Sequence, residues 1–518
     1  MINFIKKKSL LPYIALIFLN LLAHFLPFER SSPTIDEYHY LKEIYSMPIG
    51  DIYNVILHNP DRPLSMIYLD LMERLVNQNQ LLSTMLMFLI SSVFSLLVYF
   101  LMLTLLSNVS LAFLGALFHL ILPNKLELFS GLDVTTTIMN YSLALVSVIS
   151  FIYFIKIEKK RFLFLSLFTY TMAIFWYELP FFLPIALTCY AFLYGRKKMM
   201  SMAVTLLFWI PALCYAIFRF LGHYLFYAYG IVKTARGAQE TGTIWHNIIT
   251  EIPSNYVGYK MIQPILYGLY RFPTIELKWL FIISALDMVA FYGFIKWLKK
   301  TADFPENLKL IYFSIIIFIV FLIVNSFWTE VLGRHTALSS IGLVLICLFF
   351  LRFKIIQTHK VKIMASIFLF FLVVCQGVAW NQVVARRINH SLYQYLSKNK
   401  DEMLSADRIV INQYSFAKNI SYDWSAFYEG RNLLDKFWGE QCLPWNSLEE
   451  LVQVALGEKK PVFLVRSAAI NIDNNMLNFK TLFVSDNIVD VTIPKQGSVI
   501  IDYDNVFGKK YYNGNVLP

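Results

Sequence analysis

The chain has 518 residues, of which 57% are hydrophobic and 15% charged, and its formal net charge is +11. Soluble domains have about a quarter of their residues charged, so this composition excludes an ordinary soluble enzyme. Lys and Arg lie in short clusters between long apolar runs, a pattern that orients membrane helices and does not indicate a nucleic-acid-binding surface. The five cysteines show no C-x-x-C spacing, which excludes a zinc or dithiol motif of that kind.

The N-terminal segment begins with Lys6–Lys8 and continues as an apolar run over residues 9–28. A secretory signal peptide is one interpretation, but bulky residues follow the run and no small-x-small cleavage site is present. The run is also long enough to cross a bilayer, which takes about 20 apolar residues. We therefore expect an uncleaved first transmembrane helix.

Apolar runs recur as far as residue 380, and eleven of them are candidate membrane spans. They lie at 9–28, 81–107, 110–123, 137–155, 162–176, 179–195, 201–221, 277–297, 309–328, 336–351 and 363–380. If each run crosses once, the basic loops, such as Lys156–Arg161 and Arg352–Lys362, all fall on one side. The positive-inside rule makes that side cytoplasmic, together with the N terminus. We predict a polytopic α-helical membrane protein with about eleven transmembrane helices.

The non-cytoplasmic side then receives residues 29–80, residues 223–276 and the tail from about residue 381. Charged residues, Asn and Asp are frequent in the tail, and no apolar run there is long enough to span a membrane. This change in composition predicts two domains, a transmembrane body over residues 1–380 and an extracytoplasmic domain over residues 381–518.

The tail contains four segments rich in β-forming residues and one amphipathic helical segment. The β-rich segments lie at 408–412, 461–466, 480–484 and 498–503, and the helical segment lies at 448–456. We therefore expect a small α/β domain. Aromatic residues are dense between Tyr414 and Trp445. They fit either a core with a membrane-interface belt or a surface on which sugars stack.

Residues 162–195 must cross the membrane twice, because basic clusters flank them on both sides. Each half has only about 16 residues, or roughly 24 Å of helix, which is shorter than the hydrocarbon core. The turn between the halves, Phe175–Pro180, is therefore expected to lie below the outer surface. A carboxylate at that depth needs polar partners. Glu178 is thus either a substrate-binding residue or a structural hydrogen-bonding anchor.

An adjacent pair of carboxylates, Asp36 and Glu37, follows the first apolar run in the stretch Pro33–Tyr40. Such a pair can simply cap and begin a helix. The alternative is catalytic, since a carboxylate here could act as a general base that takes the proton from an attacking hydroxyl group. Asp36 and Glu37 are therefore our catalytic candidates. His39, in the same stretch, is a candidate for substrate binding.

Basic residues on the outer side are unexpected under the positive-inside rule and therefore need an explanation. Arg62 lies in the first outer loop, and Arg334 and His335 lie between the ninth and tenth runs. A guanidinium group can bind phosphate through two parallel hydrogen bonds, so these residues are candidates for substrate binding. Lipid headgroups, or pairing with the neighbouring Asp61 and Glu330, would explain them equally well.

The chain has no G-x-G-x-x-G fingerprint, P-loop or H-E-x-x-H motif, so nothing in it favours a nucleotide-binding fold. Nucleotide-activated substrates are also cytoplasmic, whereas the candidate acids and bases face outward. An outward-facing transferase would need a donor that is delivered through the membrane, such as a polyprenyl-linked sugar.

Taken together, these residues resemble the GT-C class of membrane glycosyltransferases. The stretch Asp36–Tyr40 is similar to the Asp-Glu motif of protein O-mannosyltransferases and of lipid A aminoarabinose transferases. Arg62–Leu64, Tyr177–Glu178 and Gly333–His335 resemble features of the serotype-converting O-antigen glucosyltransferases. The resemblance covers the membrane body in motif order and topology, and it does not extend to the tail.

This resemblance implies an inverting transfer of a sugar, such as glucose, from polyprenyl phosphate to a surface glycan such as the O antigen of lipopolysaccharide. Asp36 would be the general base and Glu37 would position it or the sugar, while Arg334 and Arg62 would stabilise the phosphate leaving group. The protein would be a multi-pass protein of the bacterial inner membrane. No cofactor is implied beyond the lipid-linked donor, although some relatives depend on a divalent metal.

Two other functions compete with this one. An O-antigen ligase or polymerase would share the polytopic body but would not require an acidic pair directly after the first span. A transporter of lipid-linked glycans would be favoured by internal repeats and broken helices, and the sequence shows neither. Asp287, inside the eighth run, is compatible with a transporter, because a carboxylate within a membrane span can line a substrate pathway. A hydrogen bond to a neighbouring helix is the simpler explanation.

Overall fold

The structure of the chain is a computed structural model. The residues described are 10–26, 62–76, 79–129, 131–132, 134–195, 198–228, 241–257, 259–299, 308–326, 333–351, 353–412, 448–458, 460–464, 470–482, 488–502 and 505–506. They form two compact units. The first contains the described residues up to Ala379, apart from 79–81, and the second contains 79–81 and the described residues from Trp380 onward.

Five helices in the described part of the chain are long and apolar enough to cross a membrane. They are α6 (Gln80–Leu106), α8 (Thr135–Ile157), α15 (Leu277–Leu298) and long apolar segments of α11 (Lys198–Ala228) and α18 (Lys354–Lys398). Shorter apolar helices are α2 (Leu11–Asn20) continued by η1 (Leu21–Phe25), α7 (Val109–Ile121), α10 (Leu183–Tyr194), α16 (Leu308–Ser326) and α17 (Ala337–Phe350). The chain is therefore a helical membrane protein.

A helix occupies each of the eleven positions predicted as spans, including α9 (Lys160–Trp176). That all eleven of these helices cross the membrane stays a prediction. Helix α18 extends past the last predicted span, from residue 380 to Lys398. Residues 381–398 contain neither Pro nor Gly, so nothing in their local sequence stops the helix.

Short helical segments connect the apolar helices. They are α5 (Pro63–Val76), η2 (Pro123–Phe129), α12 (Thr241–His246), η3 (Asn247–Glu251), α13 (Ile252–Ser254), α14 (Tyr259–Arg271), η4 (Phe272–Thr274) and η5 (Gly333–Thr336). Among them η2 packs against η5, and α5 packs against α8 and α9. Arg62 directly precedes α5, Lys125 lies in η2 and His335 lies in η5.

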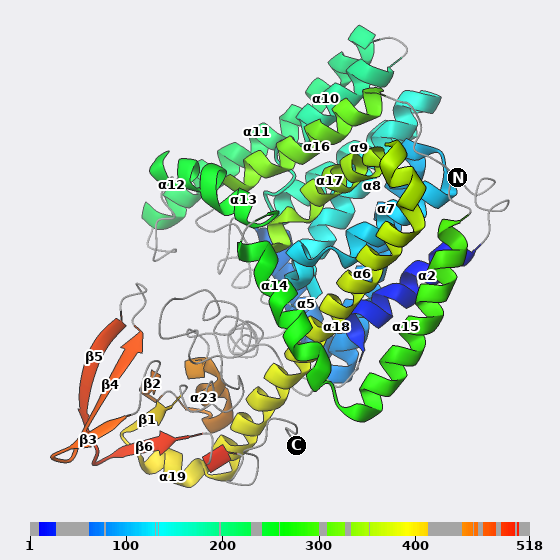
Figure 1. Ribbon diagram of the computed structural model, residues 1–518. Helices are drawn as coiled ribbons and strands as arrows, with labels where there is room; N and C mark the ends of the chain where they lie inside the picture. Colours follow the sequence, from blue (N-terminus) through cyan, green and yellow to red (C-terminus); the bar gives the residue numbers. More distant parts are fainter. Residues whose placement is uncertain are drawn as a thin grey trace. The chain divides into compact units, whose positions relative to one another are not determined.

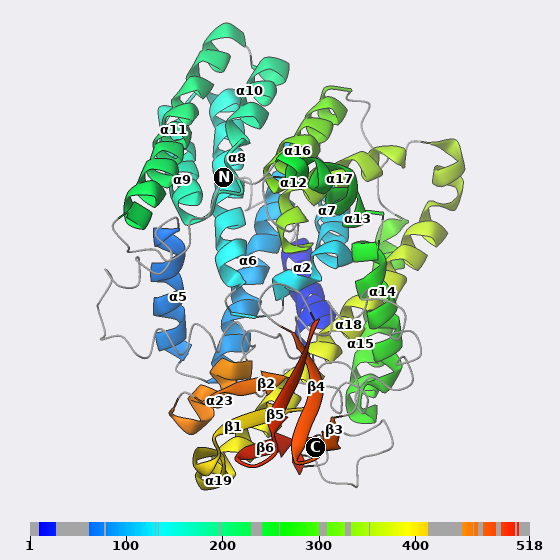
Figure 2. The same ribbon diagram turned by 90° about the vertical axis from the view of Figure 1, so that its left-hand side faces the viewer.

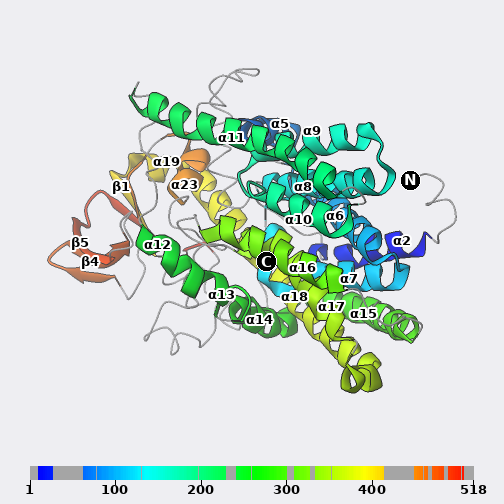
Figure 3. The ribbon, with the colours of Figure 1, turned by 90° about the horizontal axis from the view of Figure 1, so that it is seen from above.

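The first unit is held together by helices that pack along one another, as Figures 2 and 3 show for α8 with α9 and for α10 with α11. Ser147 of α8 and Ser166 of α9 join their helices reciprocally, since each hydroxyl donates to the other residue's carbonyl oxygen, at 2.9 and 2.7 Å. The helices α16 and α17 approach so closely that a Cβ atom at Gly342 would lie 2.5 Å from the Ser314 carbonyl oxygen. Small residues thus set the helix spacing here.

The C-terminal end of α7 lies inside the first unit, where side chains from three segments cap its last carbonyl groups. His24 of η1 donates to the Leu120 carbonyl oxygen at 3.2 Å, and the Cys375 thiol of α18 donates to that of Ile121 at 3.4 Å. The Lys125 amine of η2 donates to the His119 carbonyl oxygen. The last carbonyls of a helix have no intrahelical partner, so these contacts allow the helix end to be buried.

The second unit contains two small sheets, drawn at the lower left of Figure 1. Strands β1 (Arg408–Ile411), β2 (Val462–Leu464) and β6 (Ser498–Ile501) are parallel in the order β2-β1-β6, and Ile409 pairs with both Val462 and Val499. Strands β3 (Asn471–Asp473), β4 (Met476–Leu482) and β5 (Ile488–Pro494) are antiparallel. The unit also includes α19 (Lys400–Ser405) and α23 (Leu448–Leu456). Val410, Leu477 and Ile493 form one buried hydrophobic cluster in it.

The elements of the tail follow the sequence in part. Helix α23 and strands β1, β2 and β6 lie where residue types predicted them, whereas β4 begins four residues before the predicted segment. The sequence analysis missed β3 and β5. Asn474 and Asn475 between β3 and β4 have φ angles of 47° and 59°, which is the backbone of a tight hairpin turn that Asn tolerates. The aromatic segment between Tyr414 and Trp445 lies outside the described residues.

Candidate functional site

The structure describes some of the predicted site residues and not others. The catalytic candidates Asp36 and Glu37, and the substrate-binding candidate His39, lie outside the described residues. Arg334 contributes its backbone to η5, and nothing is described of its side chain. Arg62 and Glu178 are both described, and their side chains are in direct contact.

Arg62 is placed by the start of α5. Pro63 follows it as the first residue of the helix, a position that Pro favours because the missing N–H needs no partner there. Helix α5 then lies against α8 and α9, where the Tyr68 hydroxyl and the Thr135 hydroxyl are 2.9 Å apart. The Tyr68 ring also lies 5.1 Å from the Trp176 ring. These contacts bring Arg62 to the end of α9.

Glu178 is placed by the turn that follows α9. The helix ends at Trp176, and the next residue, Tyr177, is extended with φ −162° and ψ 140°. Asn140 of α8 secures this end, because its amide nitrogen donates to the carbonyl oxygens of Ala173 at 2.6 Å and Tyr177 at 3.1 Å. Pro180 cannot continue a helical hydrogen-bond pattern, so the chain turns before α10. Glu178 is 9% exposed.

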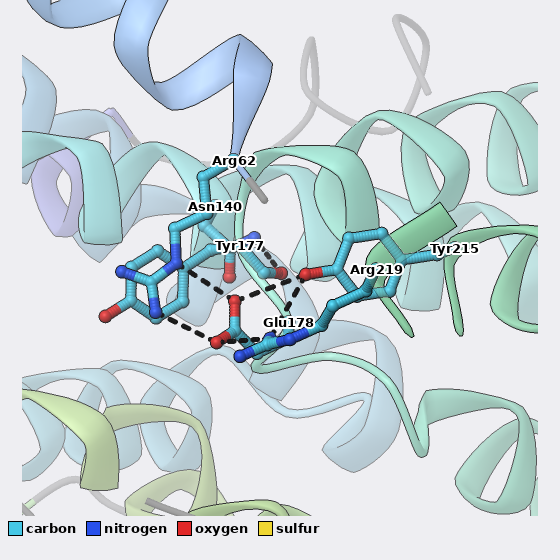
Figure 4. Close-up of polar contacts among 6 residues, drawn as sticks. All are labelled: Arg62, Asn140, Tyr177, Glu178, Tyr215 and Arg219. Carbon is cyan, nitrogen blue, oxygen red and sulfur yellow. Dashed lines mark hydrogen bonds and ion pairs between the residues drawn. The ribbon is translucent and has the colours of Figure 1, made fainter. Parts of the chain in front are cut away.

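Arg62 binds both oxygens of the Glu178 carboxylate through one edge of its guanidinium group (Figure 4). Its Nε donates to Oε2 at 3.1 Å and its Nη2 donates to Oε1 at 2.9 Å. The guanidinium group also lies over the Tyr177 ring, 3.8 Å from the ring centre. Because the fork and the ring each restrict its orientation, the Arg62 guanidinium is held in one plane.

Helix α11 completes the cluster with Tyr215 and Arg219, which lie four residues apart on one helix face. Arg219 Nη1 lies 2.6 Å from Glu178 Oε1, and the Tyr215 hydroxyl donates to Oε2 at 3.4 Å. Arg219 also donates to the Tyr215 hydroxyl oxygen at 3.3 Å. We call Arg62, Tyr177, Glu178, Tyr215 and Arg219 the arginine cluster.

The opposite charges of this cluster stabilise one another's ionised forms. Burial alone would raise the pKa of Glu178, but the guanidinium groups of Arg62 and Arg219 hold it well below its usual range. Burial alone would lower the pKa of Arg62, but the Glu178 carboxylate raises it above its ordinary value. Glu178 is therefore ionised and both arginines are charged at neutral pH, which makes the cluster an anion held by cationic donors.

His335 lies next to this cluster from a distant part of the chain. It is 3% exposed, and its ring centre is 6.4 Å from that of Tyr177, the ring beneath Arg62. Its neighbour Thr336 accepts a hydrogen bond from the amide nitrogen of Asn124 in η2 at 3.0 Å, and the same nitrogen donates to Ser340 at 3.0 Å. The segment that carries Arg334 and His335 is thus fastened to η2.

A second group of polar residues surrounds this fastening. The hydroxyl oxygens of Tyr256 and Ser339 are 2.5 Å apart, and the Ser339 and Ser340 hydroxyls both donate to the Thr336 carbonyl oxygen. Lys125 of η2 is 1% exposed, and this burial lowers its pKa to about 7. The amine of Lys125 is therefore partly uncharged near neutral pH.

The described residues contain no group of three or more His, Cys, Asp or Glu side chains that could hold a metal ion. What the arginine cluster offers is a set of hydrogen-bond donors around an anion. Arginine forks suit carboxylates and phosphates equally well.

No protein-family model matches the chain, and no curated protein sequence matches it.

The sequence analysis missed Tyr215, Arg219, Asn124 and Lys125. A signal for Arg219 was present, because an arginine near the end of an otherwise apolar run is costly in a membrane and marks a functional or paired position. Asn124 and Lys125 gave no comparable signal, since a short polar connection between two helices is ordinary.

Proposed function

We propose that this protein is an inverting glycosyltransferase that transfers a sugar from polyprenyl phosphate to a surface glycan, such as O antigen, outside the bacterial inner membrane. The observation that supports it is the arginine cluster. Two guanidinium groups and a tyrosine hydroxyl, from the start of α5 and from α11, converge on one carboxylate in the turn after α9. Such donors are what a phosphate group needs in order to bind and leave.

The proposed topology places these residues on one side. With eleven spans and a cytoplasmic N terminus, the start of α5, the turn after α9 and the end of α11 all fall on the non-cytoplasmic face. The tail of residues 381–518 falls on the same face as an extracytoplasmic domain. A nucleotide sugar would be on the wrong side, whereas a sugar on a membrane lipid can reach this face.

The proposed reaction is a single displacement. A hydroxyl oxygen of the acceptor attacks the anomeric carbon of the donor sugar while the bond from that carbon to the phosphate oxygen breaks. Asp36 takes the hydroxyl proton as general base, and Glu37 positions Asp36 or the sugar. The phosphate leaves with the electron pair of the broken bond and gains one negative charge. Arg62 and Arg334 stabilise that charge, and Arg219 joins them in this role.

The decisive experiment measures sugar transfer in membranes supplied with a labelled polyprenyl-phosphate sugar and the isolated surface glycan. Asp36→Asn should abolish transfer, since the amide cannot accept the proton. Asp70→Asn is the control, because Asp70 lies in helix α5 and pairs with Arg74 of the same helix at 2.7 Å. Transfer that survives Asp36→Asn would remove Asp36 as the base.

Mass spectrometry of the surface polysaccharide separates this function from a ligase or polymerase. Deleting a transferase that adds a side sugar leaves a chain of full length that lacks one sugar. Deleting a ligase or polymerase instead leaves glycan that is unligated or unpolymerised.

The alternative of a transporter rests on Asp287. Asp287 of α15 accepts a hydrogen bond from Gln376 of α18 at 2.7 Å, so the carboxyl group inside the eighth predicted span has a structural partner.

A further inference from the structure

Glu178 fills the centre of the arginine cluster in the way a bound anion would. Its Oε1 contacts Arg62 Nη2 at 2.9 Å and Arg219 Nη1 at 2.6 Å. Its Oε2 contacts Arg62 Nε at 3.1 Å and the Tyr215 hydroxyl at 3.4 Å. Each carboxylate oxygen therefore receives two donors. Two oxygens of a phosphate group would accept the same donors.

The donors keep contacts that do not involve Glu178. Arg62 lies on the Tyr177 ring at 3.8 Å, and Arg219 donates to the Tyr215 hydroxyl at 3.3 Å. Tyr215 is 1% exposed, so its ring is fixed by packing. If the Glu178 carboxylate moved away, these contacts would still hold the donors close to where they are now, ready for another anion.

Glu178 lies in a turn, whereas Tyr215 and Arg219 lie in helix α11. The turn covers residues 177–182, where the Glu178 backbone carbonyl accepts one turn hydrogen bond from Phe181 at 2.9 Å. Its side chain can change rotamer without unwinding a helix. The Arg219 side chain keeps 30% of its surface exposed, against 11% for Glu178. Arg219 is thus the more exposed of the two, and the proposed route for an anion runs along the Arg219 side chain.

We propose that Glu178 is a built-in anion that occupies the phosphate site of the resting protein and yields it when a phosphate group binds. The phosphate chemistry rests on the proposed function, but the competition between Glu178 and an anion does not require sugar transfer. Buried charges without partners are costly. Glu178 removes this cost while the site is empty, and its return after the reaction helps to expel the lipid phosphate.

The test is the substitution Glu178→Gln in the purified full-length protein. The amide keeps the shape of the side chain but no longer competes as an anion. Inorganic phosphate and a short-chain prenyl phosphate are titrated, and their affinities are taken from the rise in unfolding temperature with ligand concentration. We expect binding about tenfold tighter or more than in the unaltered protein, which corresponds to about 1.4 kcal/mol.

Glu276→Gln is the matched control. Glu276 precedes α15 and pairs with Lys278 at 3.2 Å, so this change also removes one negative charge from an ion pair. It should leave phosphate binding unchanged. Equal tightening in both variants would show a general effect of net charge and would overturn the proposal.

Nanodiscs distinguish the sources of the phosphate. Tighter binding of the prenyl phosphate to Glu178→Gln in phosphatidylcholine discs supports a lipid-linked donor. If only phosphatidylglycerol discs stabilise the variant, the proposal still stands and the anion is a membrane lipid headgroup. If no phosphate compound binds folded Glu178→Gln more tightly, Glu178 is a structural anchor and the proposal is wrong.

Glu178→Asp provides a second variant in case the amide prevents folding. The shorter carboxylate reaches Arg62 less well, so phosphate should again bind more tightly than in the unaltered protein, and equal or weaker binding would overturn the proposal. The outcome for the proposed function is separate. If Glu178→Gln binds phosphate more tightly but the protein shows no sugar transfer, the proposed anion site stands and the proposed glycosyltransferase function is wrong.

Discussion

Arg62 binds Glu178 through two parallel hydrogen bonds of 3.1 and 2.9 Å, although 116 positions separate the two residues in the chain. This pair joins the start of α5 to the turn after α9. Arg219 of α11 reaches the same carboxylate at 2.6 Å. Three segments that are far apart in sequence thus meet at one ionised group, and their mutual dependence can be measured.

Breaking this pair should destabilise the protein. Removing one partner of a buried ion pair costs about 3–5 kcal/mol, because the other charge is left without its partner. The Arg62 and Glu178 side chains keep 12% and 11% exposure, so we expect the lower end of that range for Arg62→Gln. Chemical unfolding of the purified protein in detergent measures the change.

The double variant tests whether the cost comes from the pair itself. Arg62→Gln combined with Glu178→Gln should cost less than the sum of the two single changes. The double variant removes both charges of the pair, whereas each single variant leaves one charge without this partner. Costs that simply add would show that the two side chains act independently.

The acid side of the pH–stability curve should depend on Glu178. Its pKa in the folded protein is held below the usual carboxyl value, by Arg62 and Arg219 against the effect of burial. The unfolded chain therefore binds this proton first as the pH falls, so the stabilisation is fully present above about pH 5 and declines below the usual pKa of roughly 4.3. Glu178→Gln should flatten the thermal unfolding curve between about pH 5 and 3, and an unaltered slope would contradict this prediction.

The alkaline side of the curve should depend on Lys125. Burial lowers its pKa to about 7 in the folded protein, while the unfolded value is roughly 10.4. Between these two values the unfolded chain binds more protons than the folded one, so this residue makes stability rise with pH. Lys125→Met should remove that rise. Lys125→Arg, which stays charged in this range, should be less stable than the unaltered protein throughout the window.

The close packing of α16 and α17 should not tolerate a side chain at Gly342. An added Cβ atom would lie 2.5 Å from the Ser314 carbonyl oxygen and 2.7 Å from the Phe318 backbone nitrogen, and backbone atoms cannot rotate away. Gly342→Ala should therefore cost about 1–3 kcal/mol. Gly293→Ala in α15 is the control, because no atom lies within 4 Å of its new Cβ. It should be neutral or stabilise by up to about 1 kcal/mol. Similar losses in both variants would contradict the packing argument.

Hydropathy predicted where helices lie, because an apolar run must satisfy its backbone hydrogen bonds internally whatever its neighbours are. Hydropathy did not predict how far a helix continues beyond its apolar run, as α18 shows by extending past residue 380 to Lys398. In the tail, the helix at Leu448–Leu456 followed from its apolar periodicity. Strand β3 has only three residues and little apolar character, so its place depends on its pairing with β4.

The candidate site was predictable only in part. Loop charge singled out Arg62. The short length of the two crossings in residues 162–195 singled out Glu178 in the turn between them. Neither pattern specifies a partner. Arg219 and Tyr215 were missed because their role depends on which face of α11 meets the turn after α9. Asn124 was missed because its partners, Thr336 and Ser340, lie more than two hundred positions away.

The sequence by itself determined that this is a helical membrane protein and placed charged candidates beside particular apolar runs. These properties are local, since they follow from the solvation of each segment. The tertiary structure decided that Arg62, Glu178 and Arg219 form one ion-paired cluster with Tyr177 and Tyr215. That arrangement depends on how helices pack over long sequence separations, where a small rotation of one helix would bring different side chains together.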